Sequence, residues 1–234
     1  MKVETDSDPQ GAGMRKGERT KQEIVRSAAP LFNRKGYEGT SLSDLMGATG
    51  LQKGGIYRHF ASKEELAAEA FDYAWGKAVS GRLDGVADVP NSVDRLKRMI
   101  SNFVERRAGL VEGGCPLLNT AVEADDGNVL LRGRARKALE AWSGRIVGVV
   151  KEGIRKREMN ARVNPRKLAR WIIGSLEGAL MISRMERDDA ALEGAREQLN
   201  EFLERAVRSG RAQANRANAS WQKHPQIISG GCDQ

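Results

Sequence analysis

Cysteine and histidine are scarce in this sequence, with two of each among 234 residues. Cys115 and Cys232 are too few and too far apart to form a disulfide framework or a zinc site. His59 has no neighbouring cluster of cysteine, aspartate or histidine, so metal binding is not predicted. This cysteine usage is typical of a reducing compartment. The sequence therefore predicts a cytoplasmic chain that needs no metal or other cofactor.

Long apolar runs are absent as well. No stretch approaches the roughly 18 apolar residues that a membrane span requires. The first residues, MKVETDSDPQ, are acidic and polar and lack the apolar core of a secretion signal. The sequence therefore predicts neither export nor contact with a membrane.

Residue patterns used by enzymes are missing too. We find no nucleophile paired with a base, no phosphate-binding glycine loop and no set of metal ligands. Glu123, Asp125 and Asp126 form an acidic cluster, but they precede a glycine at a predicted helix end and are interpreted as a solvated terminus. The sequence predicts that the protein is not an enzyme.

Alternating strand patterns and internal repeats do not occur, whereas apolar residues recur at helical spacing along most of the chain. The predicted fold class is all-α, with about nine helices. Pro30 lies inside the first of them and should kink it or cost a hydrogen bond. Residues 1–14 and 210–234 have no usable periodicity and are predicted to be a disordered arm and a disordered tail. The helices are predicted over about 20–35, 41–49, 52–60, 62–78, 92–111, from 116 on, 129–157, 164–187 and 189–207.

Positive charge is what the sequence has in excess. Lysine and arginine total 39 against 31 aspartates and glutamates, a net charge of +8. Residues 14–63 contain ten basic and four acidic side chains, so most of the net charge lies in about a fifth of the chain. This excess predicts a polyanionic partner for the N-terminal segment.

Two short helices in that segment have the dimensions of a helix-turn-helix. Ser41 and Asp44 follow the S-x-x-D capping pattern at the start of the first, and Gly50 ends it. The second contains KGGIYRHF, residues 53–60. The competing interpretation is an ordinary surface helix with a solvated basic face.

Residues at the start of the second helix suit contact with DNA. A recognition helix brings its first turn against base edges, and the glycines at positions 54 and 55 let the backbone approach closely. Each glycine costs roughly 1 kcal/mol in helix propensity relative to alanine. Lys53 can reach guanine acceptors or phosphate.

The segment GYEGTSLSDLMGATGLQKGGIYRHFASKEELAAEAF resembles the N-terminal signature of TetR/AcrR-family transcriptional regulators, over about residues 20–75. The resemblance implies a helix-turn-helix DNA-binding domain over 15–63 and an effector-binding and dimerisation domain over 64–209. It also implies a homodimeric repressor that leaves a palindromic operator when a small molecule binds. By position, the implied DNA contacts are Ser41, Leu42, Ser43, Lys53, Gly54, Gly55, Tyr57, Arg58, His59 and Lys63.

Two of these positions depart from the family pattern. Leu42 stands where many relatives have a hydroxyl, so its backbone is the expected phosphate contact. Gly55 stands where a base-contacting side chain often lies, which makes Lys53 the expected base contact. His59 could instead be a core or surface histidine. An architectural DNA-binding protein without an effector remains the alternative, and it would show no steep sequence preference.

An effector cavity would lie between the middle helices and be lined mainly by apolar side chains. Such a lining suits a hydrophobic effector, although ordinary core packing is the competing interpretation for every candidate. The candidates are Met99, Phe103, Leu117, Leu118, Trp142, Ile146, Trp171 and Met181.

The last two predicted helices have apolar stripes, and Gly174 and Gly178 are spaced to allow close helix approach. A twofold dimer would bury these stripes and place two recognition helices on one face of DNA. Burial within the same chain is the alternative. The predicted dimer contacts are Ile172, Leu176, Leu180, Leu199, Phe202 and Leu203.

Cys115 directly precedes Pro116 at a predicted helix start. A helix N-terminus can make a thiol more reactive. Two interpretations remain open for this residue, an electrophile or redox sensor and a small buried side chain.

Overall fold

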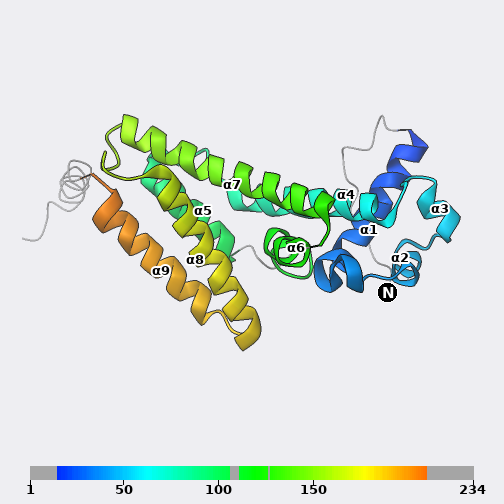
Figure 1. The fold of residues 1–234 in the computed structure, drawn as a ribbon. Helices are drawn as coiled ribbons and strands as arrows, with labels where there is room; N and C mark the ends of the chain where they lie inside the picture. The colour runs from blue at the N-terminus through cyan, green and yellow to red at the C-terminus, as the bar shows by residue number, and fades with distance from the viewer. Residues whose placement is uncertain (1–14, 106–110, 126, 210–234) are drawn as a thin grey trace, which may run out of the picture. The chain divides into compact units, whose positions relative to one another are not determined.

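The computed structural model describes residues 15–105, 111–125 and 127–209, and the regular elements in these ranges are helices (Figure 1). The predicted all-α class is confirmed. None of the described helices combines the length and apolarity needed to cross a membrane. In chain order they are α1 (Lys16–Gly39), α2 (Leu42–Thr49), α3 (Lys53–Tyr57), α4 (Lys63–Leu83), α5 (Ser92–Glu105), α6 (Pro116–Ala124), α7 (Val129–Arg155), α8 (Pro165–Glu186), α9 (Ala190–Phe202) and a π-helical turn, Leu203–Val207.

These helices form two compact units. The N-terminal unit comprises the described residues up to 81 and those within 106–140, and the C-terminal unit comprises residues 82–105 and the described residues from 141 on. The proposed domain boundary at 63/64 does not coincide with this division. Helix α6 packs against α1 and therefore belongs to the N-terminal unit. Helix α5, which lies between them in the sequence, belongs to the C-terminal unit.

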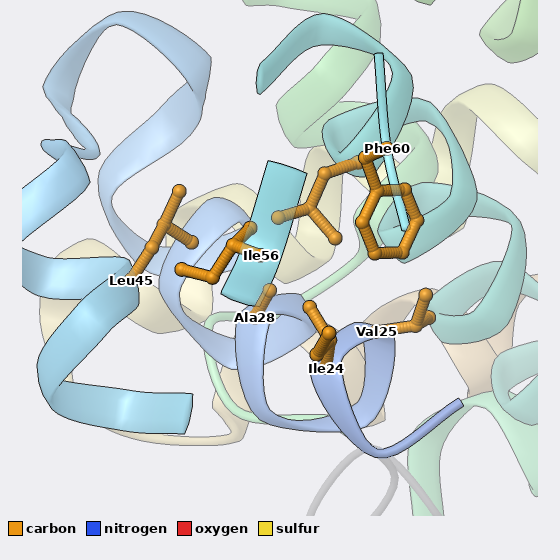
Figure 2. Packing of buried hydrophobic residues seen from close by; sticks show 7 residues of the cluster. Ile24, Val25, Ala28, Leu45, Ile56 and Phe60 are labelled. Carbon is orange, nitrogen blue, oxygen red and sulfur yellow. The ribbon is translucent and has the colours of Figure 1, made fainter. Parts of the chain in front are cut away.

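A compact apolar core fixes the first three helices. Ile24, Val25 and Ala28 of α1 pack with Leu45 of α2, with Ile56 of α3 and with Phe60 and Leu66 (Figure 2). Burying a side chain as large as isoleucine or phenylalanine contributes about 1.5–3 kcal/mol. The core thereby sets the orientation of α3, because α3 has only five residues and cannot be stable alone.

Several helix ends differ from the predictions by a few residues, such as that of α4 at Leu83. Helix α1 passes through Pro30 with helical backbone angles, without the predicted kink, and breaks at Gly36, where φ is 75° and where the sequence predicts its end. Helix α3 ends at Tyr57 because the chain tightens there, with the amide of His59 donating to the carbonyl of Ile56 at 3.0 Å. Gly54 and Gly55 have low helix propensity, so α3 has little tendency to extend further.

In the C-terminal unit, α9 packs against α5 and α8. Leu192, Leu199 and Leu203 are almost fully buried there. The buried guanidinium of Arg208 closes the end of the described chain, donating to Asp94 of α5 and to Glu204, both at 2.6 Å. The bond from Arg208, together with one from Lys97, lowers the pKa of Glu204 to about 2, although partial burial of Glu204 opposes the shift.

Candidate nucleic-acid interface

Reciprocal hydrogen bonds close the start of α2. Ser41 Oγ accepts from the Asp44 amide at 3.1 Å, and the Asp44 carboxylate accepts from the Ser41 amide at 2.9 Å. Lys35 Nζ, near the end of α1, donates to Asp44 Oδ1 at 2.6 Å. The bond from Lys35, followed by those from Ser41, holds the pKa of Asp44 well below its ordinary value. The predicted cap is confirmed, and Ser41 and Ser43 are exposed beside it.

Helix α3 divides into a buried and an exposed side. Ile56 is buried in the core, whereas Lys53 and Gly54 in the first turn are exposed. Tyr57 is half-buried. A Cβ added at Gly54 would meet no atom within 4 Å, so nothing in the protein's own packing requires glycine at this position.

The start of α4 lies against the end of α1. The Lys63 ammonium lies 4.4 Å from the centroid of the Tyr37 ring, a cation–π contact. Burial, followed by the charges of Glu64 and Glu38, raises the pKa of the Tyr37 hydroxyl. Lys63 is partly buried and lies next to the loop that joins α3 to α4.

Together these features can bind a polyanion. The N-terminus of α2 offers backbone amides to phosphate, as helix starts commonly do. The exposed side of α3 presents a lysine and Arg58 around a glycine backbone that another molecule can approach closely. This combination of phosphate contacts and a helix sized for the major groove is typical of helix-turn-helix proteins.

Comparison with known proteins identifies the chain's relatives. Residues 24–70 match the family described as "Bacterial regulatory proteins, tetR family", and residues 92–199 match "Tetracyclin repressor-like, C-terminal domain". A TetR transcriptional regulator from Chloroflexus aurantiacus J-10-FL is 42% identical, with a TM-score of 0.81, over 84% of this chain and all of that one. The chain belongs to the TetR family. It is a DNA-binding transcriptional regulator.

Other members share the same architecture with this TetR-family regulator. The regulator from Cytophaga hutchinsonii is 38% identical, with a TM-score of 0.78, over 83% of this chain and 98% of that one. The HTH-type transcriptional repressor DhaR of Mycobacterium sp. (strain GP1) is 26% identical over 186 residues, 78% of this chain and 88% of the repressor.

Within this TetR-family regulator, the predicted DNA contacts fall into two groups. The exposed group comprises Ser41, Ser43, Lys53, Gly54 and Arg58. The second group, Leu42, Gly55, Tyr57, His59 and Lys63, is partly buried. The Leu42 side chain is partly buried and packs against the apolar core, and its backbone stays the predicted contact to phosphate.

The predicted pocket residues separate into interior and surface positions. Met99, Phe103, Trp142 and Ile146 are buried in the C-terminal unit, whereas Leu117 and Leu118 belong to the N-terminal unit. Trp171 and Met181 are 42% and 55% exposed, and Trp171 lines an open cavity at the surface together with Phe202. Helical periodicity placed them on an apolar face without indicating which way that face points.

A buried ion pair lies beside Phe103 and Trp142, and no sequence pattern predicted it. The Arg82 guanidinium lies 3.5 Å from the Glu177 carboxylate, and both side chains are nearly buried. The guanidinium carbon lies 4.4 Å from the Phe103 ring centroid and 5.4 Å from that of Trp142. No local pattern could have revealed this pair, because its members are 95 residues apart.

Most predicted dimer contacts lie inside the protomer. Ile172, Leu176, Leu180, Leu199 and Leu203 are at most 5% exposed because they face the chain's own core. They cannot touch a second copy in this arrangement. Phe202 alone of the six is well exposed, at 40%.

Two further predictions concern α6. Cys115 lies at the N-cap of α6 and is buried, which limits the access of any reagent to its thiol. Glu123 was interpreted as part of a solvated terminus, and it is indeed exposed at the end of α6. Its carboxylate accepts hydrogen bonds from the backbone amides of Tyr37 and Glu38 in α1.

Proposed function

We propose that the protein is a homodimeric repressor that binds a palindromic operator and leaves it when a small molecule binds in the C-terminal unit. The observation that carries the DNA-binding part is the first turn of α3, where Lys53 and Gly54 are exposed while Ile56 is buried in the core. The name of the relative DhaR, a transcriptional repressor, supports repression as the outcome.

An exposed apolar stripe on α8 supports dimerisation. Trp171, Gly174, Gly178, Met181 and Met185 recur every three or four residues and therefore share one side of the helix. The three large side chains are 42–76% exposed, and a Cβ at either glycine would meet nothing within 4 Å. The glycines would let a second copy approach α8 closely.

Phe202 of α9 extends the same surface. Its ring meets that of Trp171 edge to face, with centroids 4.6 Å apart. We call the α8 stripe together with Phe202 the dimer face. A twofold axis through this face would pair two DNA-binding units, as a palindromic operator requires.

The effector is proposed to bind near Phe103 and Trp142 in the interior of the C-terminal unit. The two rings offer an apolar surface, and the Arg82–Glu177 pair adds buried charge. An aromatic or aliphatic body with one charged group would suit this lining, because a ligand charge could replace one member of the pair.

Selection of bound fragments from genomic DNA tests the operator directly. The selected duplex and a scrambled duplex of the same composition are then titrated at one salt concentration. We expect at least about a thousandfold preference for the selected duplex, the lower range for specific DNA-binding proteins. Equal binding to both duplexes would favour the architectural alternative, because phosphate contacts alone do not discriminate sequence.

A further inference from the structure

An open cavity lies at the surface of the C-terminal unit, between the start of α8 and the end of α9 (Figure 1). Its volume is about 510 Å³, within the roughly 300–1,000 Å³ of sites that hold small organic ligands. The π-helical turn Leu203–Val207 contributes to its lining, and π-helical turns are frequent at functional sites. We call this space the surface cavity. The interior effector site proposed above is formed by other residues.

One part of the lining is apolar. Leu168 and Val207 are buried there, and the exposed rings of Trp171 and Phe202 complete the apolar part. The two rings meet edge to face, so each is held by the other. Aromatic side chains offer a large contact area at a low cost in conformational entropy. This part of the lining suits the aromatic or aliphatic body of a ligand.

The polar side chains of the lining offer hydrogen-bond donors. Arg162 and Lys167 are exposed, and neither side chain has an ion-pair or hydrogen-bond partner among the described residues. Asn160 Oδ1 accepts from the Arg162 amide at 3.0 Å. Asn164 Oδ1 accepts from the Lys167 amide, also at 3.0 Å, so both asparagines keep their Nδ2 groups as donors. A carboxylate or sulfonate, which only accepts hydrogen bonds, fits this set.

The surrounding surface adds to the attraction for an anion. Residues 151–170 contain eight basic and two acidic side chains, a local net charge of +6. Both acidic side chains have partners of their own. Glu152 pairs with Arg95 of α5 at 2.9 Å, and Glu158 accepts from the Ser92 amide at 2.8 Å. The positive charge around the cavity is therefore mostly uncompensated and raises the local concentration of anions.

Hydrogen bonds hold the walls of the surface cavity in place. The Asn160 amide, in the loop before α8, donates to the Val207 carbonyl at 2.8 Å. Ser209 donates from its amide to the Glu158 carbonyl at 3.0 Å and from its hydroxyl to the Arg157 carbonyl at 2.6 Å. The loop and the end of the described chain are thus joined. A ligand would not have to order these walls on binding, which lowers the cost of association.

The surface cavity shares the Trp171 and Phe202 rings with the dimer face. From Trp171 the dimer face continues along α8 to Met185, whereas the cavity continues in the opposite direction to Lys167 and Asn164. The described lining has basic and no acidic side chains. A second copy has the same basic residues and is a poorer electrostatic complement to this end of α8 than an anion is.

We propose that the surface cavity is a binding site for a small organic anion with an aromatic or aliphatic body. The anionic group lies between Arg162 and Lys167, and the apolar body lies against the rings of Trp171 and Phe202. This site is separate from the proposed interior effector site. Its occupant contacts two side chains of the dimer face, and its binding requires neither DNA nor the interior effector.

Fluorescence titration of the full chain with two dyes tests the site. Anilinonaphthalene sulfonate has an aromatic body and an anionic group, and phenylnaphthylamine has the same rings without the sulfonate. Lys167→Gln removes a cation of the lining, and Arg166→Gln is the matched control, because Arg166 is exposed but does not line the cavity. We expect Lys167→Gln to weaken sulfonate binding at least about fivefold, through loss of a charge-assisted hydrogen bond at an exposed site. Phenylnaphthylamine binding to Lys167→Gln, and the binding of both dyes to Arg166→Gln, should match the wild type.

A second variant fills the cavity. Ala206 lines it and is exposed, so Ala206→Trp takes up its space without altering the buried core. We expect both dyes to bind at least about fivefold more weakly to this variant, because the apolar body loses its contact area. Dye bound at the interior effector site would be unaffected by either variant and would contribute the same background to each titration.

Three results would overturn the inference. Equal losses of sulfonate binding in Lys167→Gln and Arg166→Gln would show general attraction to a basic surface. Unchanged dye affinities in Ala206→Trp would show that the dyes bind outside the cavity. In the third, the losses appear only when each variant is combined with Gly178→Glu, which places a charge in the dimer face. A second copy then fills the cavity in the wild-type protein.

Discussion

At Gly54, stability and DNA binding favour different residues. The position is helical and exposed, with open space where a Cβ would be. Helix propensity therefore favours alanine there by about 1 kcal/mol. A glycine at such a position is explained if the backbone must approach DNA more closely than a methyl group permits.

Gly54→Ala should accordingly separate stability from binding. We expect an unchanged or higher melting temperature, because alanine reduces the conformational freedom of the unfolded chain. Operator affinity should fall by about tenfold or more, the effect of one lost close contact. Thermal unfolding and a duplex titration measure the two quantities. Wild-type affinity in this variant would show that close approach at Gly54 is not needed.

Lys63 should act on DNA through its charge alone. Its ammonium is near the Tyr37 ring in the absence of DNA, and a phosphate would compete for it. In Lys63→Ala we expect weaker binding to every duplex and a salt slope smaller by about one unit. Titrations at several salt concentrations give that slope. An altered base preference instead would mean that Lys63 contacts bases.

At the scale of helices, sequence patterns predicted the helix ends that depend only on residues close in sequence. The S-x-x-D pattern located α2 correctly, because Ser41 and Asp44 need only each other to cap it. The helix end at Gly36 was predicted as well, but the carboxylate that binds the amides after it was not, because it belongs to Glu123, 86 residues from Tyr37. The α8 dimer contacts were misplaced for a related reason. Periodicity detects an apolar stripe but does not say whether it faces the chain's own core.

The dimer face can be tested on α8 with a charge. Gly178→Glu should raise the dimer dissociation constant by at least about tenfold, because twofold symmetry brings like charges into a closely packed contact. Gly148→Glu is the matched control, since it also places a carboxylate at an open helical glycine. Sedimentation across a concentration series reports the equilibrium. Dimerisation equal to the control would exclude this face.

The contact between α5 and the end of α9 should depend on pH through Glu204. Arg208 and Lys97 bind its carboxylate and lower its pKa from 4.5 to about 2 in the folded protein. A lowered pKa stabilises the fold at pH values above the unfolded pKa. That stabilisation is lost as the pH falls from 4.5 towards 2.

Glu204→Gln should therefore reduce the melting temperature near neutral pH and weaken its decline in acid. Glu201→Gln, which removes an exposed carboxylate one turn earlier, should change neither. Thermal unfolding at several pH values makes the comparison. If the melting temperatures of wild type and Glu204→Gln decline in parallel as the pH falls, Glu204 is not the group that causes the decline.

At the scale of the whole molecule, the sequence predicted the DNA-binding helices. It did not predict which residues surround the proposed effector site. Lys53, Gly54 and the α2 cap lie close together in the sequence, so their chemistry and spacing suffice to identify a helix-turn-helix. The Arg82–Glu177 pair joins α4 to α8, and only the fold brings it beside Phe103 and Trp142. An effector cavity is defined by such distant residues, which explains why only its general apolar character was predicted.

The most direct test of the central claim is the affinity of Lys53→Ala for the selected operator, with Lys151→Ala as a control that removes an exposed lysine of α7. Both variants lose one positive charge, so the net charge of the protein changes equally. We predict that Lys53→Ala loses at least about tenfold in its preference for operator over scrambled duplex, the value of one specific base contact. Its oligomeric state and melting temperature should match those of the control. An unchanged preference in Lys53→Ala would contradict the assignment of α3 as the helix that recognises DNA sequence.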